Sequence, residues 1–139
     1  MRIPWPLGAF GNLRSFTSIS NLMFIIRELI EKDIEPGIYQ VADDEPLSTN
    51  ELIEMMALSL NRKARIWLIP KGIIRAFARI GDVIHLPLNS ERLKKLTDSY
   101  VVSNQKLKSA LGVTHLPVTS KEGLKHTLES FKTAGISKP

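Results

Sequence analysis

Apolar residues recur along most of this chain with the 3.6-residue period of an amphipathic helix. Together with capping residues, this period predicts helices over about Asn21–Lys32, from Ser48 to about Leu60, over about Lys71–Ile84, near Ser90–Leu96, from Ser103 or Asn104 to Gly112, and from Thr119 to about Ala134. The apolar face predicted for the first helix comprises Leu22, Ile25, Ile26, Leu29 and Ile30. The residues of the second helix expected to face inward are Leu52, Ile53, Met56 and Leu60.

Four short segments have the apolar composition or alternation of β-strands instead. They are Arg14–Ile19, Ile38–Ala42, Ala64–Ile69 and Tyr100–Ser103. No hairpin signal joins one of them to the next. We therefore expect strands that are connected by crossovers, in an α/β fold with a partly parallel sheet.

The segment Pro36–Asn61 is the most informative part of the pattern. A Pro-Gly turn, a predicted strand and an acidic loop lead to a helix that opens with the capping box Ser48–Glu51. Such strand–loop–helix units are the building blocks of α/β enzymes. However, the eight glycines of the chain nowhere follow the G-x-G-x-x-G spacing, so no dinucleotide fingerprint accompanies this unit.

Composition narrows the function classes. A chain of 139 residues fits one domain, and its apolar and charged fractions are those of a soluble globular protein. The absence of cysteine excludes disulfides, a thiolate nucleophile and a Cys-ligated metal. No apolar run is long enough to span a bilayer, and the first residues lack the apolar core of a signal peptide. We therefore expect a cytoplasmic protein.

The net charge of +5 permits an anionic partner. Lysine and arginine are spread along the chain, and their densest groups are Arg62–Arg65 and Arg92–Lys95. Each group is either a solvated face or helix end, or a contact to phosphate. The sequence alone leaves both interpretations open.

Candidate chemistry is sparse. The three histidines are dispersed, and neither tyrosine is followed by a lysine four residues later, as a tyrosine base of a dehydrogenase would be. The acidic cluster Asp43–Glu45 either holds a divalent cation or is a polar loop near a helix N-terminus, where the dipole favours carboxylates. Three consecutive acids do not match the ligand spacing of a calcium loop, which favours the polar loop.

Arginine gives the better candidates for ligand contact. Arg14 stands at the entry to a predicted strand, just after a loop rich in glycine and proline. Its planar guanidinium can form two parallel charge-assisted hydrogen bonds with a phosphate. Arg14 is therefore a candidate phosphate ligand, and Arg92 is a second candidate of the same kind.

Four motifs follow one another along almost the whole chain. They are Pro6-Leu7-Gly8-Ala9 with Arg14-Ser15-Phe16 and Ile19-Ser20-Asn21-Leu22; Gly37-Ile38-Tyr39-Gln40-Val41-Ala42 with Leu47-Ser48-Thr49-Asn50-Glu51-Leu52; Ser103-Asn104-Gln105-Lys106-Leu107 with Ala110-Leu111-Gly112; and Pro117 with Thr119 to Leu124. In this order and spacing the chain resembles the C-terminal part of the NAD-dependent epimerase/dehydratase family. These are extended short-chain dehydrogenases/reductases that act on nucleotide sugars.

The resemblance implies a division of labour within a larger enzyme. An N-terminal Rossmann half, which is not in this sequence, would bind NAD and carry the catalytic Tyr and Lys. Residues 1–139 would be the nucleotide-sugar-binding region, with a late Rossmann strand and helix, a small helical substrate domain and an incomplete sheet. By position, Arg14 matches the family arginine on the nucleotide diphosphate, and Leu7 and Gly8 match the loop beside the nucleobase. Arg92 lies near a second phosphate-binding arginine, whereas Asn21 caps or packs.

The expected function is that of a UDP-galactose/UDP-glucose 4-epimerase-like enzyme, with a nucleotide sugar such as a UDP-sugar as ligand. The chain by itself would bind no NAD and no metal, have no catalytic residue, be inactive, and form a homodimer or self-associate. Neither nucleic acid nor a membrane is expected as a partner. The alternatives are a nucleotide-sugar dehydratase or reductase portion, a small basic nucleic-acid-binding module, and a remnant without a ligand.

Overall fold

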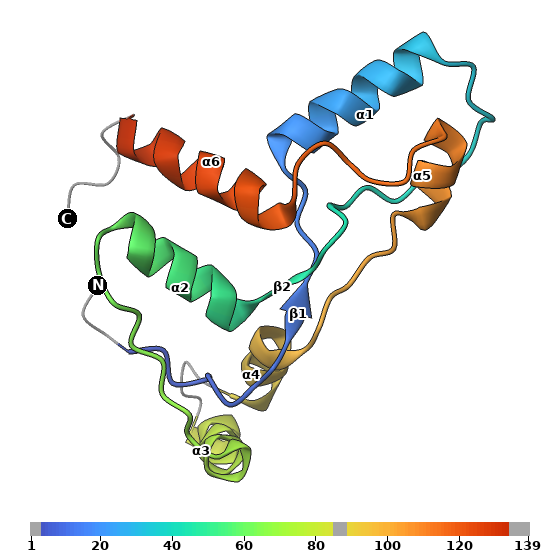
Figure 1. Cartoon of the computed structure of the whole chain (residues 1–139). Helices are drawn as coiled ribbons and strands as arrows, with labels where there is room; N and C mark the ends of the chain where they lie inside the picture. Colours follow the sequence, from blue (N-terminus) through green and yellow to red (C-terminus); the bar gives the residue numbers. More distant parts are fainter. Residues whose placement is uncertain (1–3, 85–88, 134–139) are drawn as a thin grey trace. The chain divides into compact units, whose positions relative to one another are not determined.

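A computed structural model describes residues 4–84 and 89–133 of the chain (Figure 1). The chain divides into two compact units. The first unit comprises Met1–Leu13, Ser48–Ser99 and Pro139, and the second comprises Arg14–Leu47 and Tyr100–Lys138. His85 and the predicted end of the last helix at Ala134 lie outside the described residues.

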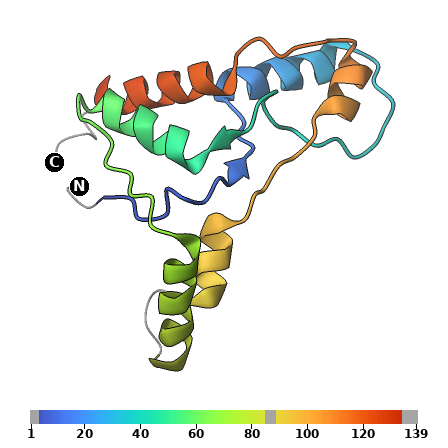
Figure 2. The ribbon, with the colours of Figure 1, turned by 60° about the horizontal axis from the view of Figure 1, so that its bottom comes forward.

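The first unit contains helices α2 (Thr49–Ser59), α3 (Lys71–Ile84) and α4 (Ser90–Thr97). Helices α3 and α4 pack side by side (Figure 2). The buried core of this unit joins the two helices to the N-terminal segment, through Leu7, Phe10, Ile74, Ala78 and Leu93. The irregular N-terminal residues are therefore a structural layer of the first unit.

The second unit contains helices α1 (Ile19–Glu31), α5 (Gln105–Leu111) and α6 (Ser120–Thr133). Its buried core consists of Ile25, Leu107, Leu111 and Leu116. Helix α5 ends at Gly112, which adopts φ 70° and lies in the left-handed region that a glycine tolerates best. The helices predicted from periodicity and caps are all present, with bounds within two residues of the predicted ones where both ends are described.

The β-structure is smaller than predicted. Strands β1 (Leu13–Arg14) and β2 (Leu47–Ser48) form a two-stranded antiparallel sheet. Single backbone bridges also join Trp5 to Ile66 and Arg14 to Tyr100 in parallel, and Leu7 to Leu68 in antiparallel. The described chain is thus a mixed α/β structure with a small sheet, and the extended strand Arg14–Ile19 was a wrong prediction because helix α1 begins at Ile19.

The predicted strand Ile38–Ala42, interpreted as the late Rossmann strand, is also wrong. The segment forms no ladder with another described strand, and side chains satisfy three of its carbonyl groups instead. Lys106 donates to the Ile38 carbonyl at 3.0 Å, Thr17 to the Val41 carbonyl at 3.2 Å, and Asn104 to the Ala42 carbonyl at 2.9 Å. The apolar alternation was real, but it packs the segment against helices rather than into a sheet.

Several apolar residues predicted to face inward are exposed. On α1, Ile25 is buried, but Ile26 and Ile30 are exposed. On α2, Met56 and Leu60 are exposed, and no residue of this helix is buried. The prediction that these residues face inward is therefore wrong for most of the predicted face of α1 and for Met56 and Leu60.

Within the described residues, no helix combines the length and apolarity that crossing a membrane requires.

Candidate functional site

Arg14 is held by its backbone against Tyr100. It belongs to β1 and forms a parallel bridge with Tyr100. The next residue, Ser15, donates its N–H to the Tyr100 carbonyl at 2.9 Å, and its Oγ accepts the N–H of Val102 at 2.9 Å. These bonds fix the backbone position of Arg14. They join two segments that are far apart in the sequence, one at Arg14 and Ser15 and the other at Tyr100 and Val102.

The guanidinium of Arg14 lies over the ring of Tyr100, with its central carbon 5.3 Å from the ring centroid. A cation at this distance is attracted by the electrons of the ring face. The stack restricts the rotamers of a long side chain, and this lowers the entropy cost of a further contact. Tyr100 is therefore a supporting residue that the sequence did not single out.

Leu7 and Gly8 lie inside the first unit. The Leu7 side chain is 5% exposed and belongs to the core, whereas Gly8 donates its N–H to the Trp67 carbonyl at 3.1 Å. A Cβ at Gly8 would overlap the Ile66 side chain. Glycine is needed at this position because the neighbouring segment of the same chain approaches closely.

Asn50 is the polar side chain next to Gly8. Its Nδ2 donates to the Gly8 carbonyl at 2.9 Å. Its Oδ1 is buried and has no hydrogen-bond partner among the described residues, and the same holds for Nε1 of Trp5. Unpaired buried polar atoms are uncommon in folded proteins. Apart from the position of Asn50 in the first turn of α2, nothing in the sequence pattern indicates that its Oδ1 is buried without a partner.

Arg92 lies in the first turn of α4, where its backbone N–H donates to Oδ1 of the N-cap Asn89 at 2.9 Å. Its side chain is exposed, and the next residue, Leu93, belongs to the core of the first unit. Leu7, Gly8 and Arg92 thus lie in the first unit, and Arg14 lies in the second.

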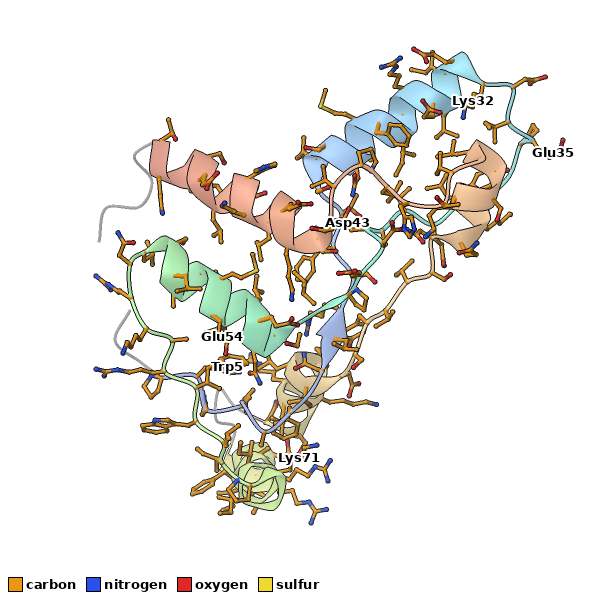
Figure 3. All side chains as sticks on the ribbon, in the orientation of Figure 1. Trp5, Lys32, Glu35, Asp43, Glu54 and Lys71 are labelled. Atoms are coloured by element: carbon orange, nitrogen blue, oxygen red, sulfur yellow. The ribbon has the colours of Figure 1, made fainter. Side chains whose placement is uncertain are left out.

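The acidic loop is part of a buried polar network in the second unit. Asp43 is 4% exposed and accepts hydrogen bonds from the backbone and hydroxyl of Ser18, which is the N-cap of α1, at 3.0 to 3.2 Å. Asn21 donates to Asp43 at 2.7 Å and also bonds both the N–H and the carbonyl of Val118. The prediction that these carboxylates sit near a helix N-terminus is confirmed, and Figure 3 labels Asp43 beside the start of α1.

Asp44 continues this network toward α5. It accepts hydrogen bonds from Asn104 at 2.9 Å, from the Lys108 ammonium at 2.8 Å and from the N–H of Leu116 at 2.9 Å. Burial raises the pKa of Asp44, but the bonds from Lys108, Leu116 and Asn104 and the charge of Lys108 outweigh it, so the pKa lies below the ordinary 3.8. The carboxylate is thus structural, and it stays ionised at neutral pH.

The described residues contain no group of three or more His, Asp and Glu side chains that is suited to a metal ion. In particular, Asp43 and Asp44 are occupied by donors of their own chain. The alternative of a divalent cation at the acidic cluster therefore has no support, because a cation needs the lone pairs that these donors already use.

Among the described residues, the glycines that lack space for a Cβ do not form a dinucleotide cradle. A dinucleotide cradle needs glycines whose missing Cβ leaves room for a pyrophosphate at a helix N-terminus. At Gly8 and Gly123, where a Cβ would have no space, the neighbouring atoms are Ile66 with Trp67 and Ser18 of the same chain. These glycines serve internal packing.

Comparisons with known proteins identify no relative. A scan against protein-family models, a search of curated proteins and a search of solved structures each find no match for this chain. Any function must therefore be argued from its residues and their geometry.

Proposed function

We propose that this chain is the nucleotide-sugar-binding portion of an NAD-dependent sugar epimerase of the UDP-glucose 4-epimerase type. The cofactor and the catalytic Tyr and Lys would be supplied by another part of the enzyme. The proposal rests on the resemblance of the four ordered motifs and on one geometric observation. This is the fixed position of Arg14, whose guanidinium is stacked on Tyr100.

Arg14 has the properties that a diphosphate ligand requires. Its charge is permanent, its planar fork matches two phosphate oxygens, and its position is set by backbone bonds rather than by a flexible loop. In this proposal Arg14 contacts the diphosphate.

An outward apolar face on α1 supports the view that this chain is a portion of a larger enzyme. Ile19, Met23, Ile26 and Ile30 are all exposed and share one side of the helix, opposite the buried Asn21 and Ile25. A monomeric soluble protein rarely exposes such a continuous apolar stripe. We propose that the cofactor-binding part covers it, and that without this part the chain self-associates.

Calorimetric titration with a nucleoside series tests the ligand. We expect UDP-glucose and UDP to bind, UMP to bind more weakly and uridine more weakly still, because the diphosphate supplies the contact with Arg14. Arg14→Ala should weaken UDP binding about tenfold or more, as expected for the loss of a charge-assisted hydrogen bond. No NAD-dependent turnover of UDP-sugar by the purified chain is expected.

Arg27→Ala is the matched control. Arg27 is an exposed arginine of the same unit, paired with Glu31 at 2.9 Å on α1. Its loss removes the same charge and should leave UDP binding unchanged. Equal losses for both variants, or no preference for UDP over uridine, would contradict the proposed role of Arg14.

A further inference from the structure

Helix α3 exposes most of its apolar face. Ile74 and Ala78 are buried in the core of the first unit, but Ile73, Phe77, Ile80 and Val83 are exposed. Phe77 is 63% exposed and Val83 77% exposed. At 100° per residue these four side chains share one side of the helix, next to the side that packs on the core. The helix therefore presents a second apolar surface away from its own unit.

A row of cations runs along α3, with Arg79 next to the apolar surface and Lys71 on the side away from it, where its ammonium lies 5.6 Å from the centroid of the Phe10 ring. Lys71, Arg75 and Arg79 follow one another at intervals of four residues, so they form one line along α3. All three are exposed, and Figure 3 labels Lys71 at the start of the helix. The neighbouring helix α4 adds Arg92, Lys94 and Lys95. From Lys71 to Thr97 the chain has six lysines and arginines but only two acidic residues, Asp82 and Glu91.

The excess of basic over acidic residues in this chain belongs to the unit that contains α3. The first unit has ten lysines and arginines against five aspartates and glutamates, whereas the second has nine of each. The net charge of +5 is thus entirely that of the first unit. Basic residues are spread along the whole sequence, and the difference in net charge becomes visible only when the residues are assigned to the two units.

We propose that the α3–α4 hairpin binds the surface of an anionic phospholipid membrane, with α3 lying in the plane of the interface. A helix with an exposed apolar face and a basic flank is the arrangement that inserts shallowly at the boundary of headgroups and acyl chains. The apolar side chains enter the acyl region, and the cations meet the negative headgroups. Binding a surface in this way is independent of nucleotide-sugar binding, and it differs from crossing a membrane.

Charge complementarity selects this occupant over two others. A second copy docked through the same face would bring the same cations together, because a two-fold interface repeats each patch on both sides. Nucleic acid would match the cations but would offer no partner to four exposed apolar side chains. The exposed stripe on α1 lacks a comparable basic row, since Arg27 is the only basic residue between Ile19 and Glu31. From the sequence, no membrane partner is expected, although the net charge of +5 permits an anionic one.

Vesicle flotation with the purified full chain tests the proposal. We expect the protein to float with vesicles that mix phosphatidylglycerol with phosphatidylcholine, and to remain unbound with phosphatidylcholine alone. Raising the salt concentration should release it, because the headgroup attraction is screened. The double variant Arg75→Gln with Arg79→Gln should lower partitioning by about fivefold per charge removed.

The apolar contribution is tested by Phe77→Ser with Ile80→Ser. Both side chains are exposed, so the fold should be preserved, as circular dichroism will check, and partitioning should fall about tenfold or more. The matched control is Ile26→Ser with Ile30→Ser, which removes two exposed apolar side chains from α1 of the second unit. The control should float as the unmodified chain does.

Four results would overturn the proposal. They are failure to bind anionic vesicles, equal binding to neutral vesicles, equal losses for the α1 and α3 variants, and binding to duplex DNA that exceeds vesicle binding and does not depend on Phe77. Light scattering of the Phe77→Ser, Ile80→Ser variant adds a fifth. If the unmodified chain is an oligomer without vesicle binding and this variant is a monomer, the face is a contact between copies of the chain.

Discussion

The two units place polar and apolar groups in opposite ways. The second unit contains the buried Asp43 and the partly buried Asp44, and donors from helix α1, helix α5 and the loop before α6 satisfy them. The first unit keeps its charges outside and exposes a large part of its apolar helix faces. The second unit is electrically neutral, and the first has the whole net charge. We therefore expect specific internal bonds to dominate the stability of the second unit, and external partners to matter most for the first.

The chain offers a means of following each unit. Both tryptophans, Trp5 and Trp67, lie in the first unit, whereas all six helices contribute to circular dichroism. Tryptophan fluorescence during urea unfolding thus reports the first unit, and circular dichroism reports both. A change confined to the second unit should shift the circular dichroism transition and leave the fluorescence transition in place.

The largest expected effect concerns Asn21, which is fully buried at the centre of the second unit. Asn21→Leu removes the bonds to Asp43 and to both backbone groups of Val118, and leaves the Asp43 carboxylate with only its bonds from Ser18 among the described residues. We expect a loss of about 3 kcal/mol in the free energy of unfolding. The circular dichroism transition should move to lower urea.

Asn50→Leu is the matched change in the first unit. Asn50 makes one hydrogen bond, to the Gly8 carbonyl, and its Oδ1 is unpaired within the described residues. A loss of only about 1 kcal/mol is expected, and it should appear in the fluorescence transition. If both variants shifted both transitions together, the units would unfold as one, and the comparison drawn between them would fail.

A second pair of variants compares glycines within helices. Gly123 in α6 lies against Ser18, the N-cap of α1, and an added Cβ would overlap the Ser18 side chain. Gly123→Ala should therefore destabilise the second unit by about 2 kcal/mol through overpacking. Gly72 in α3 has open space around the position of a Cβ, so Gly72→Ala should stabilise α3 by about 0.5 kcal/mol.

Differential scanning calorimetry distinguishes these two outcomes by the sign of the change in Tm. A stabilising Gly123→Ala variant would show that α6 can move away from Ser18 at little cost. In that case the tight packing assigned to the second unit would be wrong.

The helices were predictable because their signals are local. Ser48 and Glu51 form the predicted capping box, with the Ser48 Oγ accepting the N–H of Glu51 at 3.1 Å. Ser18 caps α1, and Gly112 ends α5 as predicted. Each of these features depends on residues within one turn of the helix end.

The strands and the buried network were not predictable because they depend on distant partners. Whether Ile38–Ala42 becomes a strand depends on a neighbouring strand, and the described chain supplies side chains instead. The bond from Asn21 to Val118 joins residues 97 positions apart, which no local pattern contains. The stacking of Arg14 on Tyr100 is of the same kind. The sequence therefore suggested Arg14 as a candidate ligand-binding residue, but it did not indicate that Tyr100 lies against it.

The last expected effect is a pH dependence that belongs to Asp44. Its pKa in the folded chain lies below the ordinary 3.8, because the bonds from Lys108, Leu116 and Asn104 favour the ionised form more than burial disfavours it. A lowered pKa contributes stability that is present above the unfolded value of about 3.9 and is lost as the pH falls through the folded value. Asp44→Asn should remove this contribution, so that the plot of the circular dichroism midpoint against pH becomes flatter on its acid side.

The matched change in the first unit is Glu91→Gln. The hydrogen bond from Lys95 lowers the pKa of Glu91 as well, but both side chains are exposed, at 68% and 72%, and solvent screens the pair. The fluorescence midpoint of this variant should follow that of the unmodified chain from about pH 6 to about pH 2. Both carboxyl groups have a lowered pKa, but we expect an effect on stability for Asp44 alone. The Asp44 carboxylate is partly buried among its donors, whereas the Glu91 carboxylate is exposed to solvent. If the circular dichroism midpoint falls equally steeply with acid in the unmodified chain and in Asp44→Asn, the Asp44 carboxylate does not contribute to the stability of the second unit in the way proposed.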